Sequence, residues 1–241
     1  MSKYELLNNV QHSDLKINTD RLSGFGDDVM FCMTFPFEFR LALSRYPIVV
    51  YQDTNDQHQF PVALFGFEEG ENLFLSDQGW DATYVPIMIQ RQPFAIGFQK
   101  QQGESEEQTV VTLNTSHPRV NKTLGYDLFN EHGGYTPYLE QVVKMLESID
   151  GGTEQNKVLI DALQKHELLE PTTFEITLKN GETNKLVGFS TVSEERFLEL
   201  DGQALEELNR SGLLLTITMM IASLSQMRGL IDRKNALTEN A

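Results

Sequence analysis

The predicted fold is decided by one stretch, PVALFGFEEGENLFLSDQGWDATYVPIMIQRQPFAIGF, which spans residues 61–98. Its first segment, residues 61–67, is apolar almost throughout, and this pattern predicts a strand that is covered on both faces near the centre of a sheet. Residues 68–72 are acidic and contain Gly and Asn, which favour a tight turn. Residues 73–75 are then expected to return as a second strand.

The rest of this stretch predicts a short helix and a third strand. Pro86 suits the first turn of a helix and Pro93 ends one, so the segment between them holds only about two turns at 3.6 residues per turn. Residues 94–98 follow as the third strand.

Outward from this stretch, alternating and β-branched residues predict further strands and their hairpins. Residues 48–51 are expected to pair with 61–67, and residues 94–99 with 109–113. The dipeptide Asn180-Gly181 is a strong hairpin signal. It predicts pairing of the strands near residues 174 and 185.

Apolar residues at helical spacing predict the helices. One stripe covers residues 138–168 and is interrupted at Gly151-Gly152, which indicates either two helices or one kinked helix. Another runs to residue 231 near the C-terminus, and we expect it to be the most buried helix.

These elements predict an α+β fold: a mainly antiparallel β-sheet with C-terminal helices packed on one face. The strands lie near residues 29, 48, 61, 73, 94, 109, 174 and 185. Residues 1–28 are expected to form a polar N-terminal arm, and residues 29–241 a single compact domain with a possible subdivision near residue 150.

The composition restricts the classes of protein to which the chain can belong. The 241 residues include 40% hydrophobic and 10% aromatic residues, which indicates a folded globule. The formal net charge of -16 argues against binding to nucleic acid or to anionic lipid surfaces, which both need concentrated Lys and Arg.

The location is predicted to be the cytoplasm. Cys32 is the only cysteine, so no disulfide forms within the chain and a reducing compartment is expected. The N-terminus lacks the apolar region of a secretory signal. The apolar run 213–222 is shorter than the roughly 20 residues of a membrane span, so no membrane insertion is expected.

Common catalytic and nucleotide-binding motifs are absent from the sequence, including the phosphate loop and G-x-S-x-G. The five histidines are scattered, mostly in polar segments, and are expected to be solvated. The acidic runs at residues 68–71 and 104–107 match no known cation-binding loop. We therefore expect no metal site and no cofactor.

A candidate ligand-binding group is formed by Trp80, Asp81, Tyr84 and Arg91. An aromatic pair beside an acid and a guanidinium often holds a small polar ligand or a peptide. The alternative, which residue chemistry favours, is structural: Trp80 and Tyr84 close the end of the sheet, and Arg91 pairs with a local acid.

Several motifs in order resemble those of the bacterial SapC family. They are Tyr46-Pro47-Ile48-Val49, PVALFGFEEGENLF, Trp80 through YVPIMIQRQPF, LLEPTTFEITLKNGE, GFSTVSEERFLEL and LIDRKN. The resemblance covers nearly the whole chain and is weakest before residue 29 and across residues 101–136. Where the family often has R-R-Y-P-F, this chain has Arg91-Gln92-Pro93-Phe94, which argues against a two-arginine anion clamp there.

The resemblance implies an accessory role. Similar proteins tend to be encoded near TonB-dependent receptors, flavin-dependent halogenase-like proteins and cupin-like oxygenases, which implies service to nutrient uptake or to modification of a protein, peptide or small molecule. We expect a non-enzymatic binding protein with a protein or peptide partner. An enzyme of unknown reaction and a surface-layer-associated structural protein are the alternatives.

Overall fold

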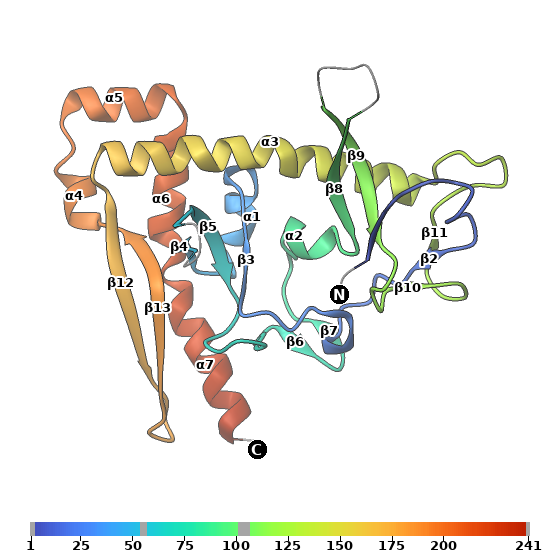
Figure 1. Ribbon diagram of the computed structural model, residues 1–241. Helices are drawn as coiled ribbons and strands as arrows, with labels where there is room; N and C mark the ends of the chain where they lie inside the picture. The colour runs from blue at the N-terminus through green and yellow to red at the C-terminus, as the bar shows by residue number, and fades with distance from the viewer. Residues whose placement is uncertain (1–2, 54–56, 101–106, 240–241) are drawn as a thin grey trace. The chain divides into compact units, whose positions relative to one another are not determined.

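The computed structural model describes residues 3–53, 57–100 and 107–239. The chain forms two compact units: unit 1 contains Met1–Asp27 and Ile87–Gly151, and unit 2 contains Asp28–Pro86 and Gly152–Ala241. The α+β class is confirmed, because antiparallel sheets are combined with C-terminal helices (Figure 1). The assignment of an arm over 1–28 and one domain over 29–241 stays a prediction.

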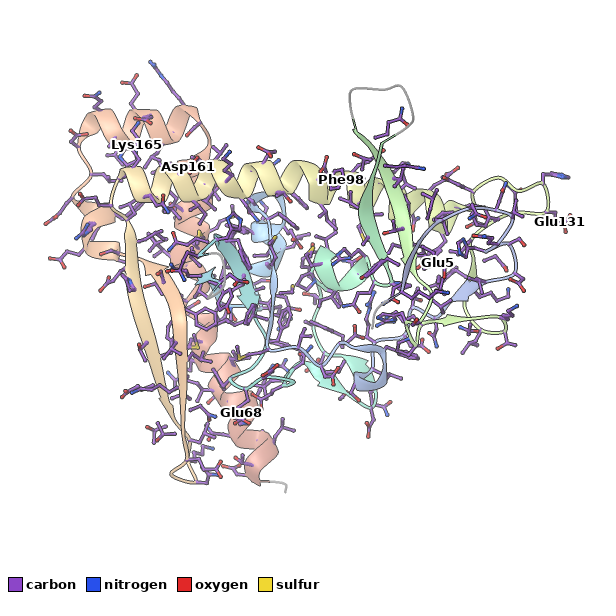
Figure 2. The ribbon with its side chains drawn as sticks, viewed as in Figure 1. Glu5, Glu68, Phe98, Glu131, Asp161 and Lys165 are labelled. Atoms are coloured by element: carbon purple, nitrogen blue, oxygen red, sulfur yellow. The ribbon has the colours of Figure 1, made fainter. Side chains whose placement is uncertain are left out.

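Unit 1 contains two small antiparallel sheets. The first has the order β1-β9-β8 and the second β10-β2-β11. Their strands are β1 (Tyr4–Leu6), β2 (Lys16–Ile17), β8 (Phe94–Lys100), β9 (Glu107–Asn114), β10 (Val120–Asn121) and β11 (Tyr126–Asp127). The predicted hairpin of β8 with β9 is confirmed, with Phe94 opposite Leu113. Phe98 of this hairpin, labelled in Figure 2, is 66% exposed.

Unit 2 is built on a five-stranded antiparallel sheet with the order β12-β13-β4-β5-β3. Its strands are β3 (Phe31–Met33), β4 (Ile48–Gln52), β5 (Gln59–Leu64), β12 (Leu169–Thr177) and β13 (Thr183–Val192). Both predicted hairpins are confirmed: Val49 lies opposite Val62, and Thr177 opposite Thr183. Strand β5 has a neighbour on each side, and its residues 61–64 are buried, as its apolar sequence predicts.

The predicted second strand, residues 73–75, is displaced along the chain. Strand β6 (Leu75–Ser76) pairs with β7 (Gly79–Trp80) instead of returning along β5. The side chain of Asn72 accepts a hydrogen bond from the Phe74 amide at 3.0 Å, and Leu73 keeps a single backbone bond to Phe65. Local side-chain bonding thus replaces a ladder here.

The helical stripe near residue 150 is one helix, α3 (Pro137–Lys165). Gly152 is buried, and a Cβ atom there would lie 2.7 Å from the ring of Phe35. Glycine is therefore used at this point for close packing, and not to end the helix.

The remaining helices are short apart from those at the C-terminus. They are η1 (Ser23–Phe25), η2 (Pro36–Glu38), α1 (Phe39–Ala42), α2 (Ile87–Gln90), α4 (Glu194–Leu198), α5 (Gly202–Arg210), α6 (Leu213–Ser223) and α7 (Gln226–Glu239). Asp201 begins α5 as its N-cap, because its side chain accepts the Ala204 amide at 2.8 Å. Lys165 of α3, labelled in Figure 2, pairs with Glu207 of α5.

The predicted last helix is divided into α6 and α7, and the expectation that it is the most buried helix is wrong for α7. Helix α6 buries Ile217 and Met220 in the core of unit 2. In α7 the buried residues are Leu230 and Asn235. Taken together, Leu213–Glu239 is long and apolar enough to cross a membrane by length and composition alone, a test that core helices of soluble proteins also pass. The absence of membrane insertion stays a prediction.

Candidate ligand-binding site

A pocket with a volume of about 680 Å³ opens in unit 1. Small-molecule sites typically have volumes of about 300–1,000 Å³. The unit 1 pocket is lined by residues from the N-terminal segment, the end of α2, strand β11 and the start of α3. They are Thr19, Arg21, Gln90, Tyr126, Asp127, Thr136, Pro137, Tyr138, Gln141, Val142 and Met145. The pocket thus combines a cation and two aromatic rings with amide and hydroxyl groups.

Arg21 is the cation of this pocket, and a buried carboxylate holds it in place. Its Nη1 donates to the Ile89 carbonyl at 3.0 Å and to Asp27 Oδ1 at 3.4 Å. Asp27 is fully buried, and its Oδ2 accepts from Arg119 Nη2 at 2.6 Å and from the Leu22 amide at 3.1 Å. One carboxylate therefore serves two guanidinium groups, which leaves one net positive charge.

Within the described residues, the carboxylate that pairs with Arg21 is Asp27, which Arg21 shares with Arg119. The Arg21 side chain is only 17% exposed. Burial, together with the positive charge of Arg119, lowers the pKa of Arg21, although an arginine remains protonated at neutral pH. A cation that has lost much of its water and shares its counter-ion is stabilised when an anion enters the pocket.

Arg119 fixes the backbone that carries Arg21. Its Nη1 donates to the Asn18 carbonyl at 3.1 Å and at shorter range to the Asp20 carbonyl. Its guanidinium also lies over the ring of Phe25, 5.1 Å from the centroid. Arg119 therefore positions the N-terminal segment that carries Arg21, and does not itself line the pocket.

Two tyrosines form the aromatic wall. The rings of Tyr126 and Tyr138 stack with centroids 5.0 Å apart and planes at 14°. Burial raises the pKa of Tyr138 to about 12, and the charges of Arg21 and Arg119 oppose this rise. The Tyr138 hydroxyl is therefore protonated at neutral pH and lies within the field of Arg21.

The first turn of α3 forms another part of the pocket. Thr136 caps the helix, since its hydroxyl accepts the Leu139 amide at 3.3 Å and donates to the Asp127 carbonyl at 2.7 Å. The positive end of a 29-residue helix is therefore at the pocket. The Asp127 carboxylate is paired with Lys16 Nζ at 2.7 Å, which offsets its repulsion of an anion.

The predicted residues Trp80 and Tyr84 lie in unit 2, within a network of buried polar groups. Trp80 Nε1 donates to the Tyr46 hydroxyl at 2.8 Å, and Tyr46 donates to the Tyr84 carbonyl. The Tyr84 hydroxyl donates to Glu38 Oε1 at 2.6 Å, and the Thr34 hydroxyl to Glu38 Oε2 at 3.2 Å. Burial and then the negative charge of Glu38 raise the pKa of Tyr84, so this tyrosine remains a hydrogen-bond donor.

The other two predicted residues have separate partners. Asp81 is exposed and accepts from Arg233 Nη1 at 2.9 Å. Arg91 belongs to unit 1, where its Nη1 donates to the Phe94 carbonyl at 2.6 Å. Among the described residues, the buried Nε of Arg91 has no hydrogen-bond partner. The structure thus connects Trp80 with Tyr84 through Tyr46, and a shared ligand for all four residues stays a prediction.

The chain was compared with known families and proteins. The profile of the family described as SapC matches residues 7–230. The chain belongs to the SapC family. No curated protein and no solved structure matches it. The part that matches SapC includes every residue that lines the unit 1 pocket, as well as Asp27 and Arg119.

Sequence reasoning missed the group of charged residues around Arg21 in this SapC protein. Asp27 lies in the segment expected to be a polar arm, and Arg119 lies within residues 101–136, where the resemblance to the family is weakest. The one available signal was the pair of arginines in segments otherwise rich in polar and acidic residues. A carboxylate and a guanidinium 92 positions apart give no pattern that identifies them as partners.

Proposed function

We propose that this SapC protein is a non-enzymatic binding or accessory protein of the cytoplasm that holds an anionic group of its ligand on Arg21. The observation that carries the proposal is the buried Arg21–Asp27–Arg119 group beside a pocket of ligand size. Two cations share one carboxylate, so a bound anion completes the local charge balance.

The other lining groups support binding. Tyr138, Thr19 and Gln141 offer hydroxyl and amide groups, and the tyrosine stack with Met145 gives an apolar surface. Fixed polar groups on a largely preformed apolar wall are typical of ligand sites. The carboxylate of the lining is ion-paired with Lys16, which favours a structural role for it over proton transfer.

The resemblance stated for the family supports the setting. A protein that serves nutrient uptake or a modification system needs to hold a peptide or a small molecule without changing it. We therefore propose that the ligand is supplied by, or passed to, a protein or peptide partner. Turnover of a bound ligand would favour the enzyme alternative, and recovery at the cell surface would favour the surface-layer alternative.

The test is a titration of ¹⁵N-labelled protein with benzoate and, separately, with phenyl phosphate. We expect at least one of the two anions to shift the amide signals of Thr19, Gln90 and Gln141 in a saturable way. Arg21→Gln should abolish these shifts, because the uncharged glutamine amide cannot form an ion pair with the bound anion.

The matched control is Lys122→Gln. Lys122 is a cation of the same unit whose side chain is 67% exposed and paired with Asp14 at 2.5 Å. This variant should retain the shifts of the wild type. If neither anion shifts the pocket signals of the wild type, or if Lys122→Gln abolishes the shifts as Arg21→Gln does, the proposed function is rejected.

A further inference from the structure

We infer that the ligand group recognised by this pocket is a single carboxylate attached to an aromatic or similarly flat apolar group, and not a phosphate. The inference rests on the proposed function, because it names the chemistry of the ligand at the same site. It follows from three observations: the free edge of Arg21, the local charge and the tyrosine wall.

The free edge of Arg21 matches a carboxylate in shape. Nη1 is fixed by the Ile89 carbonyl and by Asp27. Among the described residues, the hydrogen bonds of the Arg21 side chain come from Nη1 alone, and Nε and Nη2 have no hydrogen-bond partner. These two nitrogens form one edge of the guanidinium plane, whose parallel N–H groups bind both oxygens of a carboxylate.

The local charge matches a monoanion. Arg21 and Arg119 together with Asp27 give one net positive charge, and Lys16 with Asp127 gives none. A carboxylate balances this charge. A phosphate monoester, with a charge of about -1.5 to -2 at neutral pH, would leave negative charge uncompensated beside Asp127.

The wall of the pocket matches a flat apolar group. Tyr138 lies beneath Tyr126 in a nearly parallel stack, and Tyr126 is 56% exposed. Pro137, Val142 and Met145 extend this surface. An aromatic group packed here would gain offset stacking in addition to the burial of its own apolar area.

The experiment compares dissociation constants for phenylacetate, phenylacetamide, phenyl phosphate and acetate, measured by the same titration. We expect phenylacetate to bind at least tenfold more tightly than each of the other three. The amide lacks the charge, acetate lacks the ring, and phenyl phosphate carries the wrong charge and shape. Tighter binding of phenyl phosphate than of phenylacetate would overturn the inference and leave the proposed anion site intact. Binding of none of these anions would reject the proposed function itself.

Two variants test the stated contacts. Arg21→Lys keeps the positive charge but removes the fork of donors, so phenylacetate should bind at least tenfold more weakly. Tyr126→Ala should weaken the binding of phenylacetate and leave the binding of acetate unchanged. Equal affinity of Arg21→Lys and wild type for phenylacetate would overturn the two-point contact, and equal loss of both acids in Tyr126→Ala would overturn the aromatic contact.

A comparison with peptides distinguishes the two possible sources of the carboxylate, a free acid and a peptide C-terminus. Acetyl-Gly-Phe with a free carboxyl end is compared with the same dipeptide amidated at that end. Tighter binding of the free dipeptide than of phenylacetate would assign the site to peptide C-termini. The reverse order would assign it to free aromatic acids, and equal binding of the free and amidated dipeptides would contradict carboxylate recognition in peptides.

Discussion

At the residue scale, the buried carboxylate of Asp27 joins Arg21, Arg119 and the Leu22 amide in unit 1. It has no solvent exposure, and the Arg119 side chain beside it is 1% exposed. Buried charges are costly unless they are paired and hydrogen-bonded, so each partner is stabilised only while the other is present. The pocket residue Arg21 depends on this pair for its position.

Asp27→Ala is expected to lower the free energy of unfolding by about 3–5 kcal/mol, because it leaves Arg119 buried without its counter-ion. Chemical denaturation of the purified protein measures this loss. The control is Asp14→Ala, which breaks the exposed pair with Lys122 and should change stability by about 1 kcal/mol or less. Equal effects of the two substitutions would show that the Asp27 pair contributes no more than a surface pair.

His117 is expected to make the stability of unit 1 sensitive to acid. Burial and then the charge of Arg119 lower its pKa, while the charge of Asp27 opposes this. The unfolded chain, with a histidine pKa near about 6.5, then binds more protons than the folded chain below that pH. The contribution of neutral His117 to the free energy of unfolding is therefore fully present above about pH 6.5. It is lost as the pH falls toward the pKa of His117 in the folded state.

His117→Asn should reduce the fall in Tm between pH 7.5 and pH 5, because it removes this titration. Asparagine keeps an acceptor for the Arg119 amide, which lies 3.2 Å from His117 Nδ1. His132→Asn, at an exposed loop position, is the control and should behave as the wild type does. An unchanged fall in Tm in His117→Asn would contradict the assignment of the acid sensitivity to His117.

At the scale of elements, α6 is the helix that holds unit 2 together. Ile217 and Met220 are buried on its inner face, and the Ser223 hydroxyl accepts the Ile48 amide of β4 at 2.8 Å. Leu224, which follows the helix, is only half-buried. Beyond α6 the apolar residues contribute less to the core, and Leu230 is the buried apolar side chain of α7.

Lys234 of α7 is an ionic anchor in the same unit. Its Nζ lies 2.5 Å from Glu71 and 3.1 Å from Glu68, which is labelled in Figure 2. The Lys234 side chain is 12% exposed, and Glu71 also accepts the Phe67 amide at 2.8 Å. This charge pairing connects α7 to the turn after β5 and explains why α7 needs few buried apolar residues.

Ile217→Asp is expected to give insoluble or molten protein, because an unpaired buried carboxylate costs several kcal/mol, a large part of total stability. Leu215→Asp on the outer face of the same helix is the matched control, since Leu215 is 53% exposed. Soluble expression and near-UV circular dichroism measure the difference. A folded Ile217→Asp protein with the Tm of the wild type would show that this face does not carry the core.

At the scale of the whole molecule, the charge distribution bears on the proposed ligand and partners. The chain carries a formal net charge of -16, yet the pocket of unit 1 contains a net positive group. An acidic surface disfavours nucleic acid and anionic lipid, whereas a small buried cation recognises a single anionic group. This combination is in accordance with the proposed binding of a small acid or of a peptide end.

We predict that fractionated cells contain the protein in the cytosol, in accordance with its lone cysteine and its acidic surface. Immunodetection in the soluble, membrane and surface fractions measures this. A cytosolic enzyme and an outer-membrane receptor serve as markers. A majority in the membrane fraction would indicate instead that the apolar Leu213–Glu239 segment acts as an anchor.

The sequence by itself determined the features that depend on neighbours along the chain. The pairings of β4 with β5, of β8 with β9 and of β12 with β13 were predicted correctly, because alternation and turn residues such as Asn180-Gly181 act locally. The lone cysteine and the family motifs were also readable directly. The continuity of α3 through Gly151-Gly152 was not readable from the sequence. Gly152 packs against Phe35, and local helix propensity carries no information on that contact.

Only the tertiary structure decided the candidate site. Arg21, Asp27 and Arg119 come from segments without periodic signals, and their charges matter because folding removes them from water together. The pocket adds Tyr126 and Tyr138 from two further elements. The interaction of buried charges depends on distance and solvent exclusion, and neither quantity is encoded in the spacing of residues along the chain.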